Sequence, residues 1–284
     1  METSAEQTGI ARSAGTEGGV VYRTFIFCFS IACYGGFLLV FLYLLAFLGN
    51  LQVTVLADAV PAIRAWVPQS VDLGRDMGSL GAAVLINVGL IALFGLQHSV
   101  MARPAFKRAW TCVVPTEAAR STYVLIASAV LAFMMWQWRP IPSPVLWQAD
   151  AAWTAAVGWG VMGLGVAVLL WATFLIDHFE LLGLRQGWTT LRGQQLRPSA
   201  FVTPYLYKIV RHPQYLGWLL IFWGAPSMTA WHLLFAAGMT GYILIAIRFE
   251  ERDLVKYIGA DYERYRQQVP PLVPVPGRRF SGRS

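Results

Sequence analysis

Five long stretches of this 284-residue chain contain no Asp, Glu, Lys or Arg, and they limit its possible folds more than any other feature. These stretches hold 34, 26, 18, 26 and 36 residues and lie at positions 24–57, 77–102, 121–138, 151–176 and 212–247. A helix that crosses a bilayer needs about 20 mostly apolar residues, so each of the first four stretches accommodates one crossing. The chain is therefore expected to be an integral membrane protein.

The fifth stretch is too long for one helix and slightly short for two ideal ones. Pro226 lies within it, in Gly224-Ala225-Pro226-Ser227, where a tight turn would divide the stretch. The sequence therefore predicts a helical hairpin with arms at Tyr215–Ala225 and Trp231–Ile247, the first of them short, tilted or partly re-entrant. The predicted fold class is an all-α, polytopic integral membrane protein with five to six transmembrane helices.

Four regions are expected along the chain. Residues 1–24 form a flexible cytoplasmic N-terminus, residues 25–202 the N-terminal transmembrane helices, residues 203–271 a C-terminal signature region, and residues 272–284 a basic tail. The helix cores in the first four charge-free stretches are expected at Phe25–Leu48, Leu80–Val100, Thr122–Trp138 and Thr154–Ile176.

Charged residues make up 13% of the chain, against about 25% in a typical soluble domain. This composition excludes intrinsically disordered proteins, disulfide scaffolds and nucleic-acid-binding modules. Of the 22 Lys and Arg residues, 19 fall in the two terminal tails and in the second and fourth connections. Because cytoplasmic loops retain basic residues, both termini are expected in the cytoplasm. Contact with anionic membrane lipid accounts for the net charge of +7, so no nucleic-acid partner is expected.

Ionisable side chains beside a membrane-spanning segment are costly and usually functional. Two clusters of this kind end predicted helices on the cytoplasmic side. Gln97-His98-Ser99 ends the second span, and Asp177-His178-Phe179-Glu180 ends the fourth. Each admits two interpretations: an imidazole tuned for proton transfer, or a polar cap at the membrane interface. The three cysteines show no metal-ligand spacing, so no metal is expected.

A third cluster surrounds the predicted hairpin. Arg211-His212-Pro213-Gln214-Tyr215-Leu216-Gly217 enters it, and Arg248-Phe249-Glu250-Glu251 leaves it. Pro213 suits the first turn of a helix, which places Arg211 and His212 just before a helix N-terminus that attracts anions. Because the hairpin turns back, Glu250 and Glu251 return to the same edge of the membrane. One cytoplasmic pocket is therefore expected to offer anion-binding and cation-binding groups together, which would suit a zwitterionic ligand with an added positive centre.

Several ordered motifs across residues 203–271 resemble the C-terminal signature of membrane methyltransferases that act on isoprenylcysteines and phospholipids. They are Arg-His-Pro-x-Tyr-x-Gly, the hydrophobic hairpin, Arg-x-Glu-Glu, and Gly-x-x-Tyr-x-x-Tyr-x-x-x-Val-Pro. Within that group, residues 94–107 and 177–184 are similar to the bacterial methanethiol S-methyltransferases. Membrane proteins linked to nitrogen-oxide metabolism share parts of the first of these two segments.

The resemblance implies S-adenosylmethionine as the cofactor and methyl donor, methanethiol as the small-molecule thiol substrate, and dimethyl sulfide as the product. It also implies a multi-pass protein of the bacterial inner membrane. The residues that match the donor-binding part of the signature are His212, Tyr215, Gly217, Glu250 and Glu251, while Arg211 and Arg248 match its basic positions. Tyr207 is a further candidate, because aromatic faces attract a positively charged methyl-sulfonium.

A thiolate, rather than a thiol, attacks the methyl group, so the site must remove a proton or stabilise the anion. His98 is the first candidate for the base, and His178 with Asp177 and Glu180 alongside is the competitor. Arg248 is a further candidate catalytic residue. The charged donor is expected to enter from the cytoplasm and the apolar thiol from the surrounding membrane.

Three alternatives stay open at this point. The same fold would serve a methyltransferase for a prenylcysteine, a phospholipid or another small thiol. A haem-carrying membrane subunit would use two of His98, His178, His212 and His232 as axial ligands, although the chain has no Cys-x-x-Cys-His attachment motif. A transporter or scaffold would bind no methyl donor.

Overall fold

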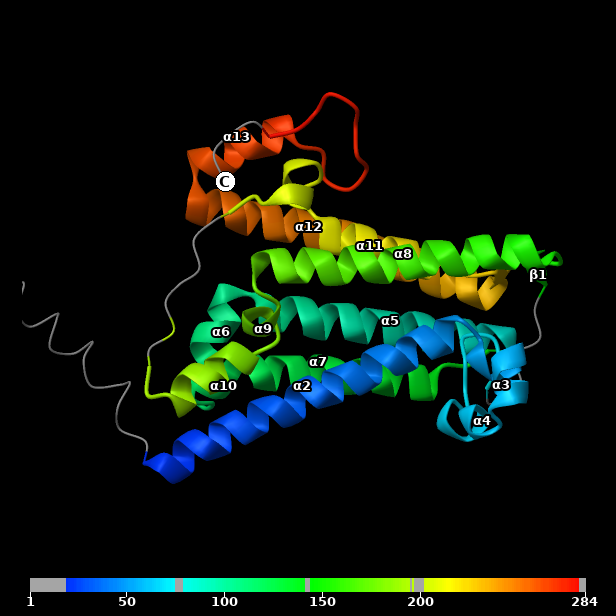
Figure 1. Ribbon diagram of the computed structural model, residues 1–284, viewed down its shortest axis with the longest axis horizontal. Helices are drawn as coiled ribbons and strands as arrows, with labels where there is room; N and C mark the ends of the chain where they lie inside the picture. The colour runs from blue at the N-terminus through cyan, green and yellow to red at the C-terminus, as the bar shows by residue number, and fades with distance from the viewer. Residues whose placement is uncertain (1–18, 75–78, 141–143, 195, 197–201, 281–284) are drawn as a thin grey trace, which may run out of the picture.

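The computed structural model describes residues 19–74, 79–140, 144–194, 196 and 202–280. Five of its helices are long and apolar enough to cross a membrane: α2 (Val20–Leu48), α5 (Leu80–Ala102), α7 (Thr116–Gln137), α8 (Ala152–Ile176) and α12 (Ala230–Ile258). Helices α2, α5, α7 and α8 alternate in direction along the bundle, and α12 runs in the same direction as α8 (Figure 1). The predicted polytopic helical membrane protein is therefore confirmed.

Shorter elements cap the two ends of the bundle (Figure 1). One end, here called the signature end, carries α6 (Pro104–Trp110), α9 (His178–Leu181), α10 (Leu184–Leu191), η2 (Tyr205–Lys208) and α13 (Ala260–Gln268). The opposite end carries η1 (Leu51–Val53), α3 (Val55–Ala59), α4 (Ala62–Trp66) and an antiparallel pair of strands, β1 (Val145–Gln148) and β2 (Ser227–Thr229). All three polar clusters identified in the sequence lie at or near the signature end.

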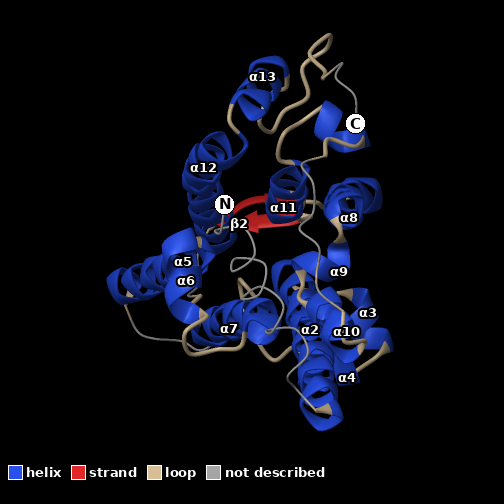
Figure 2. Cartoon of the chain, turned by 90° about the vertical axis from the view of Figure 1, so that its left-hand side faces the viewer, coloured by secondary structure: helices blue, strands red, loops and turns tan. Residues whose placement is uncertain are grey.

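The five long helices and the shorter α11 form two layers, visible when the bundle is viewed along its axis (Figure 2). Helices α12, α11 (Pro213–Trp223) and α8 make one layer, and α5, α7 and α2 make the other. Aromatic side chains join the layers near the opposite end, where the Phe235 ring packs 5.5 Å from Trp138, 5.6 Å from Phe222 and 6.2 Å from Phe47 between ring centroids.

The polarity of the bundle is that of a protein surrounded by lipid. Large apolar side chains such as Leu39, Leu85 and Leu164 are exposed on the outer faces of the long helices. Polar Asn87 is fully buried, and its amide is satisfied by the backbone of Arg139, with distances of 3.1 Å to the carbonyl and 2.9 Å from the N–H. Buried polar groups without water need such partners.

The predicted hairpin is present, and its first arm is short. Helix α11 has 11 residues, or about 16 Å of rise, which is less than the hydrocarbon thickness of about 30 Å. After α11, the chain turns through Pro226 into β2, which pairs with β1. The strand pair was not expected from the sequence, because β1 is exposed along its whole length and shows no alternation of apolar and polar residues.

Both ends of the described chain are more ordered than a flexible lead-in and a free tail would be. Helix α2 begins at Val20, so the last residues of the predicted flexible N-terminus are helical, while residues 1–18 lie outside the described part of the chain. The tail packs back onto the signature region as far as Phe280, whose N–H donates to the Lys208 carbonyl at 3.0 Å. Its ring lies 5.3 Å from that of Tyr265.

Glycines allow α8 and α11 to approach closely. A Cβ atom at Gly165 of α8 would lie 2.7 Å from the Gly217 carbonyl oxygen, and one at Gly217 would lie 2.8 Å from the Gly165 carbonyl oxygen. Such backbone contact between membrane helices is typical of small residues. It fixes the position of α11 and therefore of the residues at its N-terminus.

Gly165→Ala is expected to destabilise the protein by about 1–3 kcal/mol, because its methyl group would meet backbone atoms of α11. Gly163→Ala on the same helix is the matched control, since a Cβ atom there meets nothing within 4 Å. Thermal unfolding of both variants in detergent measures the difference. Equal stability of the two would contradict close packing at Gly165.

Candidate functional site

The Arg-His-Pro motif is held at the start of α11 by the Val-Pro motif that follows α13. The Arg211 N–H donates to the Pro270 carbonyl at 2.9 Å, and the His212 N–H donates to the Pro271 carbonyl at 3.0 Å. His212 is the N-cap residue of α11, and Pro213 occupies the first turn, where a missing N–H costs nothing. Two segments almost sixty residues apart therefore form one structural unit.

Arg211 and Glu251 form a partly buried ion pair at the centre of this unit. Both Nε and one terminal nitrogen of Arg211 lie 2.7 Å from Oε1 of Glu251, and the side chains are only 10% and 13% exposed. The other terminal nitrogen donates to the Arg266 carbonyl at 2.7 Å and to the Val269 carbonyl. Every nitrogen of the guanidinium is thus engaged by the protein, so Arg211 holds α12 and the segment after α13 together.

His212 and Glu250 extend this arrangement towards the membrane. The His212 Nε2 lies 3.1 Å from Glu251 Oε1, and its Nδ1 lies 3.9 Å from Glu250 Oε2. The Tyr215 hydroxyl donates to Glu250 Oε2 at 2.9 Å. The Glu250 side chain is 42% exposed, in contrast to the buried Glu251. Glu250 is therefore the carboxylate that can meet a ligand.

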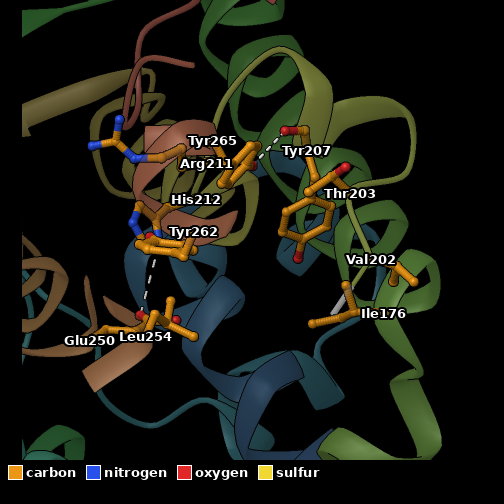
Figure 3. Close-up of a pocket in the computed structure, with 10 residues that line it drawn as sticks. All are labelled: Ile176, Val202, Thr203, Tyr207, Arg211, His212, Glu250, Leu254, Tyr262 and Tyr265. Carbon is orange, nitrogen blue, oxygen red and sulfur yellow. Dashed lines mark hydrogen bonds and ion pairs between the residues drawn. The ribbon is translucent and has the colours of Figure 1, made fainter. Parts of the chain in front are cut away.

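A cavity of about 240 Å³ opens beside these groups (Figure 3). Glu250 and Leu254 lie on one side of it, and Tyr207, Val202 and Ile176 on the other (Figure 3). The remaining lining residues are Thr203, Arg211, His212, Tyr262 and Tyr265. The cavity thus combines a carboxylate, an imidazole and tyrosine rings with an apolar wall.

Three tyrosines outside the long helices shape the cavity. The Tyr265 hydroxyl donates to the Tyr207 carbonyl at 2.5 Å, and the Tyr207 hydroxyl contacts the Ala172 carbonyl of α8 at 3.4 Å. Burial raises the pKa of Tyr207, Tyr262 and Tyr265 well above that of a free phenol. They are therefore neutral and present aromatic faces and hydroxyls, but no charge, to a ligand.

His98 lies in a separate polar group between α5 and α7. Its Nε2 is 2.9 Å from the Tyr123 hydroxyl, and its ring packs against those of Phe94 and Tyr242 with centroids 5.4 Å and 6.3 Å away. His98 does not line the cavity described above. Tyr123 and Tyr242 lie near Tyr215, whose hydroxyl contacts Glu250 at the cavity.

The Asp177, His178 and Glu180 cluster makes mainly structural contacts. Asp177 caps α9 by accepting the Glu180 N–H at 2.9 Å. The His178 Nε2 lies 3.0 Å from the Tyr34 hydroxyl and its Nδ1 lies 2.9 Å from the Thr173 hydroxyl, so both ring nitrogens have partners. Burial lowers the pKa of His178, which favours the neutral ring.

Arg185 forms ion pairs with Asp177 and Glu180. The charges of this cluster are therefore partly balanced by the loop that follows it, and none of its members lines the cavity.

The structure brings together six of the predicted site residues at the signature end: Tyr207, Arg211, His212, Tyr215, Glu250 and Glu251. Gly217 is buried against α8 and Arg248 is exposed on α12, and neither lines the cavity. Sequence reasoning missed Tyr123 and the lining residues Thr203, Val202 and Leu254. Tyr262 and Tyr265 were visible as the repeated tyrosines of the Gly-x-x-Tyr-x-x-Tyr motif, but no motif marks Tyr123.

Comparisons with known proteins agree on a family. The model of the NnrU protein family matches residues 85–268. Methanethiol S-methyltransferase 2 of Bradyrhizobium diazoefficiens is 49% identical over 254 residues, which cover 89% of this chain and 91% of that protein. Methanethiol S-methyltransferase of Mycobacterium tuberculosis is 43% identical over 90% of this chain and 98% of its own length.

A more distant relative is Nurim of Danio rerio, which is 33% identical over 70% of this chain and 74% of its own length. No solved structure matches the chain.

Glu251→Gln is expected to lower the free energy of unfolding by about 1.5–3 kcal/mol, because the partly buried Arg211 loses its charged acceptor. The matched control is Glu263→Gln on α13, where the side chain is exposed. Thermal unfolding in detergent, followed by limited proteolysis of the segment after α13, reports the effect. A Glu251→Gln protein as stable and as protease-resistant as the control would contradict the central place given to this ion pair.

Proposed function

The chain belongs to the NnrU protein family and groups with the methanethiol S-methyltransferases, and on this basis we propose that it methylates methanethiol with S-adenosylmethionine as the donor. The products are dimethyl sulfide and S-adenosylhomocysteine. The observation that carries the proposal is the identity of 43–49% to such enzymes over about nine tenths of the chain. The presence at one end of a cavity suited to a zwitterionic donor supports it.

The residues of the cavity fit the donor chemically. When bound, S-adenosylmethionine supplies a methyl group on a positively charged sulfur. Glu250 offers a partly exposed carboxylate for a positive group, and the rings of Tyr207, Tyr262 and Tyr265 offer faces for a purine or a sulfonium. The cavity is smaller than the roughly 300–1,000 Å³ of sites for drug-sized ligands. It would therefore enclose part of the donor.

Within this proposal, the residues around the cavity divide into two groups. His212, Glu250, Tyr207 and Tyr215 bind and orient the donor. Arg211 and Glu251 keep those residues in place, because their polar atoms are already used by the protein. Gly217 contributes by letting α11 lie close to α8, which sets where His212 begins the helix.

We propose His98, rather than His178, as the base that removes the thiol proton. Both nitrogens of His178 are engaged by hydroxyl groups of Tyr34 and Thr173. His98 has one engaged nitrogen, and its Nδ1 is buried without a hydrogen-bond partner in the described part of the chain. A free nitrogen within reach of the substrate is what general-base catalysis requires.

We also propose that the signature end faces the bacterial cytoplasm, with both termini on that side. The concentration of 19 of the 22 Lys and Arg residues in tails and connections of this end supports the orientation. The donor would then enter from the cytoplasm and the thiol from the membrane. A green fluorescent protein fused after Ser284 would fluoresce in this orientation. Activity of a periplasm-dependent alkaline phosphatase at the same position would contradict it.

His212→Ala is expected to reduce formation of dimethyl sulfide by about 10²-fold, because a displaced donor loses its alignment with the thiol. Lys256→Gln is the matched control, an exposed residue on α12 away from the cavity. Purified proteins receive methanethiol and S-adenosylmethionine, and headspace gas chromatography measures the product.

If His212→Ala forms dimethyl sulfide as fast as the control, the proposed role of the cavity in the reaction is contradicted. If the wild type binds the donor but makes no dimethyl sulfide, the acceptor is a lipid, a prenylcysteine or another thiol instead of methanethiol. Calorimetry with S-adenosylhomocysteine distinguishes this case from a protein that binds no donor.

A further inference from the structure

The hydrogen bonds of Tyr123 define which nitrogen of His98 carries a proton. The Tyr123 hydroxyl lies 2.9 Å from Nε2 of His98 and 3.4 Å from the backbone carbonyl oxygen of the same residue. A carbonyl can only accept, so the single hydroxyl proton is donated to it. The hydroxyl oxygen is then left to accept the Nε2 proton. This pattern favours the neutral tautomer in which Nε2 is protonated and Nδ1 is not.

In this tautomer, the Nδ1 atom of His98 carries a lone pair and no proton inside the protein. It is buried and has no hydrogen-bond partner in the part of the chain that the structure describes. Folded proteins rarely leave a buried polar atom unsatisfied, and an exception calls for an explanation such as a catalytic role. A ligand that brings its own proton would satisfy this nitrogen.

Helix α12 closes the surroundings of His98 with an aromatic ring. A Cβ atom at Gly95 would lie 2.8 Å from the Tyr242 ring, so only glycine lets this ring reach α5. The Tyr242 ring stands edge-on to His98, with ring centroids 6.3 Å apart. The rings that pack against the His98 side chain are thus aromatic, which suits a small apolar ligand.

Tyr123 and Tyr242, which contact His98, lie near Tyr215, whose hydroxyl donates to Glu250 at the cavity wall. A thiol held at His98 and a methyl group held at the cavity would therefore be brought together beside this tyrosine cluster.

We propose that Tyr123 is a positioning residue that holds His98 in the Nε2-protonated tautomer, so that Nδ1 accepts the proton of the thiol substrate. This inference rests on the proposed function. The S–H bond breaks as the proton moves to Nδ1, and the electron pair left on sulfur forms the new S–CH₃ bond. The old C–S bond breaks at the same time, and its electron pair neutralises the donor's positive sulfur. The imidazolium then releases the proton to solvent.

The charged and titratable groups around His98 agree with a transient imidazolium. The guanidinium of Arg120 lies 5.1 Å from the centre of the Tyr123 ring and is fixed by a hydrogen bond of 2.5 Å to the Leu181 carbonyl. Its positive charge favours a thiolate nearby and disfavours a lasting positive charge on His98. Tyr242, Glu250 and Arg103 are further charged or ionisable groups near this cluster.

Nitrogen NMR measures the tautomer directly, because the chain contains only four histidines. Protein labelled with ¹⁵N-histidine is compared with His98→Gln, which identifies the His98 signals. We expect a pyridine-type Nδ1 and a pyrrole-type Nε2 in the wild type at neutral pH.

Tyr123→Phe should give a mixture of tautomers and about tenfold slower turnover, with an unchanged KM for the donor. General-base catalysis contributes about 10²–10⁴-fold in total, so a partial loss of this size is expected.

Tyr257→Phe is the matched control, because this tyrosine is exposed on α12 and lies outside the cluster. A pyrrole-type Nδ1 or an imidazolium in an active wild-type enzyme would overturn the role of Tyr123 and leave the proposed function intact. The expected tautomer in a wild-type protein that makes no methylated thiol would overturn the proposed function, and the role of Nδ1 with it. The wild-type spectrum decides the tautomer even if Tyr123→Phe does not fold.

Discussion

The partly buried ion pair between Arg211 and Glu251 is the interaction on which the candidate site depends. It ties the entrance of the hairpin to its exit, and the remaining guanidinium nitrogen donates to the carbonyls of Arg266 in α13 and Val269 after it. Removing one partner of such a pair leaves the other charge partly desolvated and without its counter-ion, which costs more than the pair contributes. The pair therefore explains why His212 and Glu250, which come from two different helices, face one cavity.

In our proposal, the remaining architecture divides the chemistry between a donor side and an acceptor side. The donor side consists of a polar cavity at the signature end, bounded by α13 and the loop before η2. The acceptor side is the aromatic surrounding of His98 between α5, α7 and α12. Close packing of α8 against α11 through Gly165 and Gly217 fixes the position of the hairpin. The charged donor thus reaches the site through the polar cavity, and the apolar thiol reaches it through the aromatic surroundings of His98.

Much of this organisation could be predicted from the sequence, because charge-free length and basic-residue placement are strong signals in membrane proteins. The five long helices, the hairpin divided near Pro226 and the pairing of the Arg-His-Pro motif with Glu250 and Glu251 all followed from such patterns. The contacts of His178 could not be predicted, because a polar helix cap and a cluster that tunes an imidazole for proton transfer use the same residue types. The contact between Tyr123 and His98 could not be predicted either, because it depends on where α7 crosses α5.

The central claim is that this chain moves the methyl group of S-adenosylmethionine onto methanethiol. The most direct measurement supplies purified wild-type protein with methanethiol and a donor whose transferable methyl group is deuterated. Headspace mass spectrometry should detect dimethyl sulfide that carries one intact deuterated methyl group and accumulates with the protein concentration. Unlabelled dimethyl sulfide, or none at all from a protein that binds the labelled donor, would contradict the account.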